Sequence, residues 1–318
     1  MKLLVTGGLG FIGSNFIEHI LNERPDVSVL NVDRCDYCAR IHNVTAESRY
    51  TYVMCDITNI HKMRKLFSEF KPDVVIHFAA QSHVDSSFDN SLQYINDNII
   101  GTWSILECVR EWPSILIHIS TDEVYGEVDI DQTSSAETSV LNPTNPYAAT
   151  KAGAELLVSS YGHSFKVPYV ITRGNNVFGP KQYPEKLIPN FITKILKSEP
   201  CEVHGEGRSR RNFIYVDDVS RAISTILDHV TKTSEHFGKI FNIGTRNEYS
   251  VLDIYEKIIQ SLKTSGSYIH VNDRPHNDKR YCVDTTALTE LGWKEEANFD
   301  EALATTIKWY QENPNWYN

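Results

Sequence analysis

The first half of the chain alternates between short apolar runs and longer segments whose apolar residues recur at helical spacing. Residues 3–6 form an apolar run that stops at glycines, as a buried parallel strand would, and residues 11–22 carry apolar side chains at helical spacing. The same pattern predicts further strands at residues 27–32, 52–54, 74–78, 115–119 and 169–172, and helices at residues 61–70, 92–110 and 145–161. Strands that alternate with helices predict βαβ units, so we expect an α/β fold with a Rossmann-type, doubly wound parallel sheet.

The regular alternation ends after Arg173, and Pro180, Pro184 and Pro189 punctuate the loop-rich stretch that follows. We therefore expect a Rossmann domain over residues 1–174 and a smaller α/β domain over residues 175–318 that binds the substrate. Within the second half, residues 213–227 and 240–243 again have strand and helix patterns. Residues 213–243 are accordingly expected to pack back on the first domain.

Composition narrows the classes of partner. The chain of 318 residues has 31 Lys and Arg against 41 Asp and Glu, and its net charge of -10 argues against a nucleic-acid partner. Its apolar stretches fall short of the roughly 20 residues that span a bilayer, so no membrane partner is expected. Six scattered cysteines and an apolar start too short for a secretory signal favour the cytoplasm. Cys35 and Cys38 form one C-x-x-C pair with no second pair, so ordinary thiols and no metal site are expected.

A glycine-rich turn lies between the first predicted strand and the first predicted helix. Gly7, Gly10 and Gly13 fit a dinucleotide-binding turn, and Phe11 and Ile12 open the helix whose N-terminus would face a pyrophosphate. The alternative is a plain glycine turn. The strand, the helix and an acidic residue twenty positions after the last glycine together favour the dinucleotide.

That acidic residue is Asp33, at the end of the second predicted strand, where a carboxylate can hydrogen-bond the adenosine ribose. Asp33 would repel the 2′-phosphate of NADP and so favours NAD, whereas the adjacent Arg34 could pair with such a phosphate. Asp56 and Ile57 follow the third predicted strand and are expected beside the adenine. The alternative for Asp56 is an N-cap of the helix that begins near Ile60.

Two short motifs carry the candidate chemistry. Tyr147 and Lys151 lie four residues apart on a predicted helix, where the lysine would lower the pKa of the phenol; an ordinary surface pair is the alternative. Thr121, Asp122 and Glu123 follow the fifth predicted strand, at the end of the sheet where ligands bind. The two carboxyl groups suit an elimination, with Glu123 removing a carbon-bound proton and Asp122 protonating the departing hydroxyl, while Thr121 hydrogen-bonds the reacting sugar oxygen. A solvated acidic turn is the alternative.

These motifs resemble those of extended short-chain dehydrogenase/reductases, and among them the nucleotide-sugar 4,6-dehydratases. The resemblance covers nearly the whole chain and rests on residues 7–13, 79–85, 121–126, 145–151, 184–189, 211–218 and 273–275. It implies that NAD stays bound while it takes a hydride from sugar C4 and returns it to C6, with loss of water between C5 and C6. The product would be a nucleotide-linked 4-keto-6-deoxyglucose.

The resemblance also implies which residues bind the ligands. Besides the residues above, the expected NAD contacts are Ala79, Ala80, Ser82, Tyr147, Lys151 and Asn176. The expected substrate contacts are His83, Thr121, Asn175, Lys186, Leu187, Asn190, Val203, His204, Arg211, Asn242, Arg274 and Asp278. Arg211 and Arg274 would bind the diphosphate through their guanidinium forks. The alternative for the basic run at Arg208, Arg210 and Arg211 is a solvated turn.

The nucleotide is a separate question. Residues 173–180 and 274–281, with Gln81, are more similar to the UDP-glucose enzymes of UDP-rhamnose pathways than to bacterial dTDP-glucose enzymes. UDP-glucose is therefore the expected substrate and dTDP-glucose the alternative. Two further readings stay open: a nucleotide-sugar 4-epimerase or decarboxylase, and a non-catalytic NAD-binding regulatory protein. The resemblance also implies a homodimer built from residues 92–110 and 145–161, and a separate epimerase/reductase downstream.

Overall fold

A seven-stranded, entirely parallel sheet forms the centre of the computed structural model, which describes residues 1–318 except 46, 129–133, 274–279 and 318. The strand order is β10-β6-β5-β4-β1-β2-β3. Its strands are β1 (Lys2–Thr6), β2 (Ser28–Asp33), β3 (Tyr50–Met54), β4 (Val74–His77), β5 (Ile115–Thr121), β6 (Tyr169–Gly174) and β10 (Ile240–Ile243). The expected Rossmann-type α/β fold is thus confirmed, since the order reverses beside β1, where such sheets bind their ligands.

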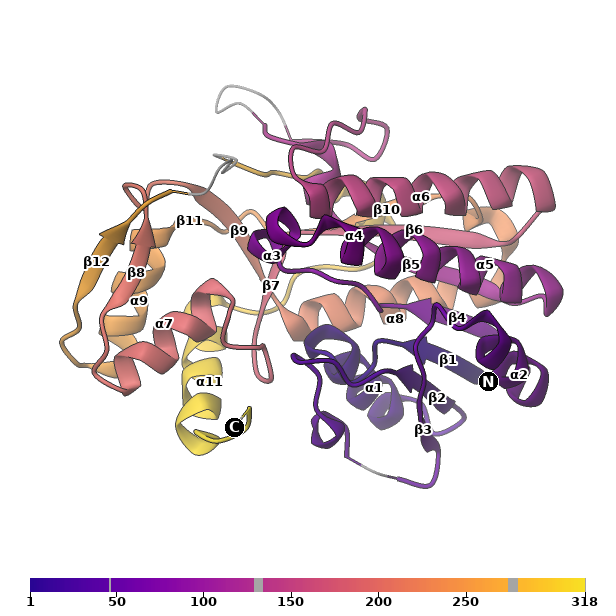
Figure 1. Ribbon diagram of the computed structural model, residues 1–318, viewed down its shortest axis with the longest axis horizontal. Helices are drawn as coiled ribbons and strands as arrows, with labels where there is room; N and C mark the ends of the chain where they lie inside the picture. The colour runs from indigo at the N-terminus through magenta and orange to yellow at the C-terminus, as the bar shows by residue number, and fades with distance from the viewer. Residues whose placement is uncertain (46, 129–133, 274–279, 318) are drawn as a thin grey trace.

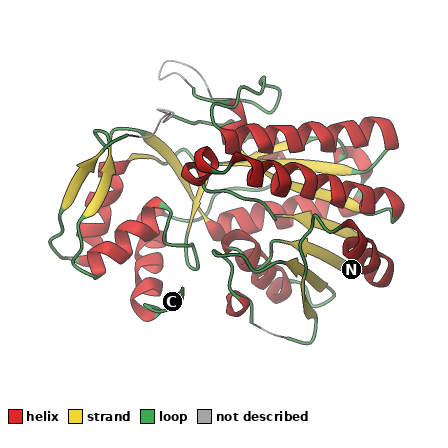
Figure 2. Cartoon of the chain, in the orientation of Figure 1, coloured by secondary structure: helices red, strands yellow, loops and turns green. Residues whose placement is uncertain are grey.

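Helices cover both faces of this sheet (Figures 1 and 2). On one face lie α2 (Ile60–Phe70), α5 (Gly101–Glu111) and α6 (Pro146–Phe165), and on the other α1 (Phe11–Glu23) and α8 (Val216–Lys232). Two separate apolar clusters hold these layers, because successive residues of a strand point to opposite faces. Ile117 on β5, for example, packs toward α1 and α8, whereas its neighbour Leu116 packs toward α5 and α6.

The helix predicted over residues 92–110 is interrupted. It consists of α4 (Ser91–Tyr94), a π-helical turn (Ile95–Ile100) and α5, and it follows the short helix α3 (Val84–Asp89). The π-helical turn buries two polar side chains, Asp97 and Asn98, which the helical apolar pattern alone could not place. Turns of this kind inside α-helices occur often at functional sites.

A smaller lobe is built from the second half of the chain. Its elements are β7 (Asn176–Phe178), β8 (Cys201–His204), β9 (Arg210–Tyr215), β11 (Glu248–Ser250), β12 (Tyr268–Val271), α7 (Leu187–Leu196), α9 (Val251–Leu262) and α11 (Phe299–Glu312). The lobe contains a three-stranded sheet of order β11-β9-β7 and a two-stranded sheet in which β12 pairs with β8. A third apolar cluster, which includes Phe178, Phe191 and Phe299, fills the space between these elements.

The chain between residues 210 and 243 is shared by both parts. Strand β9 pairs with β7 and β11 in the smaller lobe, but α8 packs on α1 and β10 extends the large sheet beside β6. The short helix α10 (Thr286–Glu290) contacts β10 as well. Because β6 and β10 are parallel neighbours, the loops that follow them lie side by side at the same end of the large sheet. Within the described residues, no helix is long and apolar enough to cross a membrane.

Candidate active site

A deep cleft opens at the carboxyl ends of β1, β2, β5 and β6, between the large sheet and the loop before α7. It is lined by the glycine turn, by the end of β2, by the loop after β4, by Thr121, Asp122 and Glu123, and by Tyr147 and Lys151. The two groups of residues that the sequence linked to a dinucleotide and to elimination chemistry therefore share one continuous cavity.

The glycine turn is close-packed in a way that requires glycine. Gly7 has φ of +72°, and a Cβ built on it would lie 2.6 Å from the backbone nitrogen of Ala79. A Cβ on Gly13 would lie 2.5 Å from the carbonyl oxygen of Gly7. Gly10 stands directly before α1 and makes no side-chain cap, and Gly10, Phe11, Ile12 and Gly13 at the start of that helix line the cleft. This cradle fits a pyrophosphate, which binds at helix N-termini.

The adenosine end of the cleft favours NAD over NADP. The Asp33 carboxylate, whose pKa is raised by burial, accepts hydrogen bonds from the backbone N–H groups of Leu9 (3.0 Å) and Cys35 (2.7 Å). The Arg34 guanidinium donates to both carboxylate oxygens of Asp97, at 2.9 and 2.6 Å, and also contacts Asp36 and Asp56. Since Arg34 is bound by three carboxylates, it is not presented for a 2′-phosphate.

Asp56 and Ile57 also lie in this part of the cleft. The alternative role for Asp56, as N-cap of the next helix, is wrong: Asn59 caps α2, accepting from the backbone N–H of Lys62. Asp56 instead accepts from the backbone N–H and the hydroxyl of Thr58.

The loop after β4 is held by the π-helical turn. The Asn98 amide accepts from the Gln81 backbone N–H at 2.8 Å and donates to its carbonyl at 3.1 Å, and it donates to Thr150 as well. Ala79, Ala80 and Ser82 line the cleft around this anchor. Asn98 and Asp97 were missed in the sequence because only the π-helical geometry turns them inward.

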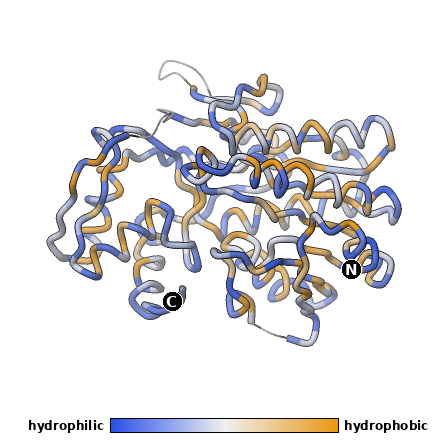
Figure 3. The backbone as a smooth tube through the Cα atoms, in the orientation of Figure 1, coloured by the Kyte–Doolittle hydropathy of each residue, from blue (hydrophilic) through white to orange (hydrophobic). Residues whose placement is uncertain are grey.

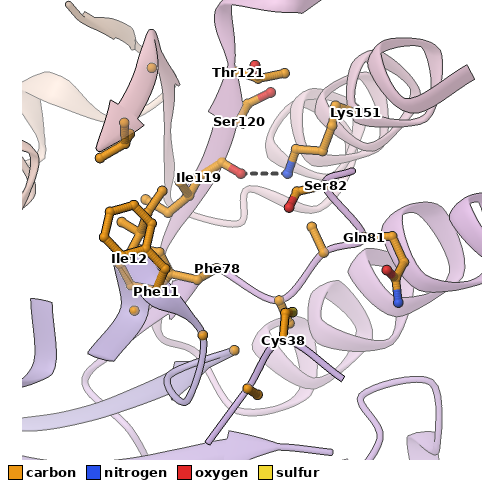
Figure 4. Close-up of a pocket in the computed structure, with 18 of the residues that line it drawn as sticks. Phe11, Ile12, Cys38, Phe78, Gln81, Ser82, Ile119, Ser120, Thr121 and Lys151 are labelled. Carbon is orange, nitrogen blue, oxygen red and sulfur yellow. Dashed lines mark hydrogen bonds between the residues drawn. The ribbon is translucent and has the colours of Figure 1, made fainter. Parts of the chain in front are cut away.

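Lys151 projects from α6 toward β5, where its ammonium donates to the Ile119 carbonyl at 2.6 Å (Figure 4). Burial lowers the pKa of Lys151 to about 8, against the opposing charge of Glu155 one turn later on α6. Tyr147 is also buried. Its pKa is raised by burial and by the charge of Glu123, while hydrogen bonding to Thr121 lowers it. Burial and Glu123 thus outweigh the other effects on this pKa, and its lowering by Lys151 and a nicotinamide remains a prediction.

The Asp122 carboxyl group has a strongly raised pKa. Burial, followed by the charge of Glu123, raises its pKa to about 7. Its Oδ2 accepts from the Asn175 amide at 2.7 Å, and its Oδ1 accepts from the Thr121 hydroxyl at 3.3 Å. Glu123 accepts from the amide of Asn145, a residue whose own side-chain oxygen caps α6. Near neutral pH Asp122 is therefore able both to hold and to give up a proton, beside a second carboxyl group.

Three further expected ligand contacts line the same cleft as this acid pair, and a fourth, Arg211, acts on Asp122 through its charge. Asn175, Asn176 and Lys186 line the cleft, and the Lys186 ammonium donates to the Ser82 carbonyl at 2.7 Å. Arg211 has its guanidinium 4.8 Å from the centre of the Tyr281 ring, and its charge acts on Asp122.

Others lie outside the cleft lining. His83 pairs with the hydroxyl of Ser86 at 2.9 Å, Asn190 donates to the Pro184 carbonyl at 3.1 Å, and Leu187 packs against the core of the smaller lobe. His204 pairs with the Asn272 carbonyl. Arg274 and Asp278 fall outside the described residues.

Two expected contacts have side chains that are fully buried within the protein. The Val203 side chain is fully buried in the core of the smaller lobe, so its side chain is not presented to a nucleotide. Asn242 is also fully buried: its amide oxygen accepts from Tyr125, and its NH2 group donates to the carbonyls of Ser135 and Asp284. Every hydrogen-bonding atom of the Asn242 amide is used within the protein.

The chain matches the GDP-mannose 4,6 dehydratase family over residues 4–306. It is 41% identical to the dTDP-D-glucose 4,6-dehydratase of Mus musculus, covering 100% of this chain and 91% of that protein. It is 40% identical to a trifunctional UDP-glucose 4,6-dehydratase/UDP-4-keto-6-deoxy-D-glucose 3,5-epimerase/UDP-4-keto-L-rhamnose-reductase of Arabidopsis thaliana, covering 99% of this chain but 48% of that protein. The chain therefore spans about half the length of the trifunctional plant proteins that it matches.

A solved structure shows the same architecture. The dTDP-glucose 4,6-dehydratase DesIV from Streptomyces venezuelae, with NAD and TYD bound, superposes with a TM-score of 0.93 at 35% identity, covering 99% of this chain and 98% of that one. Fold, motif geometry and sequence similarity along almost the full length agree. The chain belongs to the GDP-mannose 4,6 dehydratase family, alongside the nucleotide-sugar 4,6-dehydratases.

Proposed function

We propose that this protein is a UDP-glucose 4,6-dehydratase that converts UDP-glucose into UDP-4-keto-6-deoxyglucose and water. The observation that carries the proposal is Asp122, a buried carboxyl group with a pKa of about 7, beside Glu123 and in one cavity with Tyr147 and Lys151. A simple oxidation or epimerisation at C4 needs a single acid–base group. Removal of water requires a further acid and a further base. Their pKa values must differ, so that one carboxyl group holds a proton while the other can accept one.

The cofactor of this reaction is NAD, for which the glycine cradle and Asp33 provide the site. When bound, NAD accepts the C4 hydride, returns it to C6, and brings a positive nicotinamide charge that favours the Tyr147 phenolate. The last effect matters because burial and Glu123 raise the pKa of Tyr147 in the protein itself. Lys151 lies at the same end of the cleft and adds a second positive charge.

The protein groups then move three protons. Tyr147 takes the proton of the C4 hydroxyl, which creates a C4 ketone and acidifies C5. Glu123 removes the C5 proton and returns it to C5 later, while Asp122 gives its proton to the C6 hydroxyl, which leaves as water. Tyr147 ends with one proton more and Asp122 with one fewer. Before the next cycle a proton must return from Tyr147 to Asp122. The Thr121 hydroxyl interacts with both groups and so connects them.

UDP is proposed over dTDP on the sequence similarity of residues 173–180 to the UDP-glucose enzymes. Gln81 supports this assignment less than expected, because its side-chain amide donates to Asp36 and Asp97 on the cofactor side. The two nucleotides differ by one methyl group on the base and one ribose hydroxyl. A pocket contact with one methyl group changes binding by about 1–3 kcal/mol, so measurable turnover of dTDP-glucose is expected as well.

A homodimer is proposed as the working form. The segment from α4 to α6 exposes several large apolar side chains, and hydrophobic and hydrophilic stretches alternate along α6 (Figure 3). These side chains are Leu92, Ile95, Ile100, Trp103, Leu156 and Phe165. Helices α5 and α6 pack side by side (Figure 1), so two copies would bury this face in a four-helix contact. The product is proposed to pass to a separate epimerase/reductase.

The test is incubation of the purified protein, without added cofactor, with UDP-glucose and dTDP-glucose in parallel, followed by mass spectrometry. Loss of one water, faster from UDP-glucose, is the expected result and also requires retained NAD. An unchanged mass with a new C4 epimer would replace the proposal with an epimerase. No change even with added NAD would favour a non-catalytic NAD-binding protein.

A further inference from the structure

Asn175 follows the carboxyl end of β6 and is 4% exposed. Its backbone N–H donates to the Ile243 carbonyl of the neighbouring strand β10 at 2.9 Å, which fixes its place at the end of the sheet. Its side-chain NH2 group donates to Oδ2 of Asp122 at 2.7 Å, and its side-chain oxygen accepts from the backbone N–H of Thr245 at 3.1 Å. Both ends of the amide are therefore bound within the protein.

The orientation of this amide is forced. Only its oxygen can accept from the Thr245 N–H, so the NH2 group must face Asp122. Gly244 adjoins the same amide, and a Cβ at that position would overlap the Asn175 side-chain oxygen. Thr245 is itself anchored, because its hydroxyl donates to the Glu295 carboxylate at 2.7 Å.

Three adjacent strands thus converge on one carboxyl group: Asp122 follows β5, Asn175 follows β6, and Gly244 with Thr245 follows β10. A carboxyl group that accepts a hydrogen bond from an NH2 group on one oxygen carries its proton on the other oxygen. For Asp122 that other oxygen is Oδ1. The Thr121 hydroxyl donates to Oδ1 when Asp122 is ionised, and a protonated Oδ1 would instead donate to the Thr121 oxygen once that hydroxyl has turned away.

On the basis of the proposed dehydratase function, we propose that Asn175 is a positioning residue for the general acid. Its amide is held by the Thr245 N–H and fits beside Gly244 because that residue has no side chain. In this position it keeps the acidic proton of Asp122 on Oδ1. This role differs from the diphosphate contact expected from the sequence. A residue that binds the diphosphate acts on substrate affinity, whereas a residue that positions the acid acts on the chemical step and its pH dependence.

The charge environment of Asp122 gives the sign of the pH effect. The Asn175 hydrogen bond stabilises the ionised form and so lowers the pKa of Asp122, against the larger raising effects of burial and of Glu123. Arg211 also lowers it. The titratable groups that interact with Asp122 are Glu123, Tyr147, Arg211 and Cys282. Removal of the Asn175 hydrogen bond alone must therefore raise the pKa of Asp122.

The test compares Asn175→Leu and Asn175→Asp with the wild type, using kcat, KM and the pH profile of kcat. The basic limb of that profile, where Asp122 loses its proton, should move up by about one pH unit or more in Asn175→Leu, because a hydrogen bond to a charged group is lost. It should move further in Asn175→Asp, whose carboxylate repels the ionised form of Asp122. KM should change by less than about threefold in Asn175→Leu, while kcat falls on the order of tenfold or more.

Gly244→Ala provides a second variant that leaves both residues in place and displaces the Asn175 amide, with the Val283 side chain as the other group that its Cβ would meet. Its kcat should fall and its basic limb should move in the same direction as in Asn175→Leu. A raised KM with an unmoved basic limb in the Asn175 variants would overturn the proposal and restore the diphosphate role. An unmoved limb in Gly244→Ala, in protein with wild-type circular dichroism, would overturn it too. A wild type that releases no water would instead reject the dehydratase function.

Discussion

The buried Asp122 carboxyl group should lower the free energy of unfolding, and its replacement should show by how much. In Asp122→Asn the amide oxygen can still accept from Asn175. The NH2 group can donate to the Thr121 oxygen, which reverses the direction of the present bond but keeps the contact. What disappears is a buried acid that resists ionisation. We therefore expect the inactive variant to be more stable than the wild type at neutral and alkaline pH.

The magnitude follows from the pKa. Burial and Glu123 raise the pKa of Asp122 from 3.8 to about 7, and the group is 2% exposed, so solvent screening is small. Because each pKa unit corresponds to about 1.4 kcal/mol, the folded state is penalised by up to about 4 kcal/mol. The penalty is absent below the unfolded-state value of 3.8, grows as pH rises toward about 7, and is constant above it.

The assay is chemical unfolding of both proteins at several pH values with saturating NAD, since bound cofactor adds its own stability. The gain in free energy of unfolding for Asp122→Asn should be largest above about pH 7 and shrink toward zero near pH 4. Asp89→Asn, at an exposed carboxylate in α3, is the control for loss of one charge. A gain that is absent at alkaline pH, or that does not shrink on acidification, would refute a raised pKa at Asp122.

Three further perturbations test other parts of the site. Gly7→Ala would force a Cβ into the Ala79 backbone at a positive φ. Denaturation of the purified variant should therefore release less NAD than denaturation of the wild type, and its free energy of unfolding should fall by at least about 1–2 kcal/mol. Release of as much NAD as from the wild type would contradict the role of the glycine turn. Glu155→Gln leaves the buried Arg173 guanidinium without its carboxylate and should cost about 3–5 kcal/mol, measured by unfolding, whereas an unchanged stability would contradict a buried ion pair. Tyr147→Phe should lower kcat on the order of a hundredfold or more while NAD is retained, and a near-normal kcat would remove Tyr147 from the chemistry.

The fold was predictable because its signals are local. Strand runs, helical spacing and the glycine turn each depend on a few neighbouring residues, and the parallel order follows from their alternation. The resemblance placed Thr121, Asp122, Glu123, Tyr147 and Lys151 near one another, and the structure brings them into one cavity.

What the sequence could not provide depends on contacts between distant segments. The hydrogen bonds from Asn175 to Asp122 and Thr245 exist because β10, far along the chain, returns to the edge of the sheet beside β6. Asn242 illustrates the converse: at the end of a predicted strand it could as well face a ligand as the interior, and its buried partners settle the matter. The raised pKa of Tyr147 could not be predicted either, because it results mainly from burial, and a short motif does not show whether a side chain is buried.

Transfer of a deuterium label within the sugar tests the central claim most directly. The protein is incubated with UDP-glucose deuterated at C4, and the product is analysed by NMR and mass spectrometry. The account predicts loss of one water with the deuterium retained and moved to C6, because the same bound NAD accepts and returns the hydride. A label that remains at C4, or that is lost without appearing at C6, would contradict a 4,6-dehydratase.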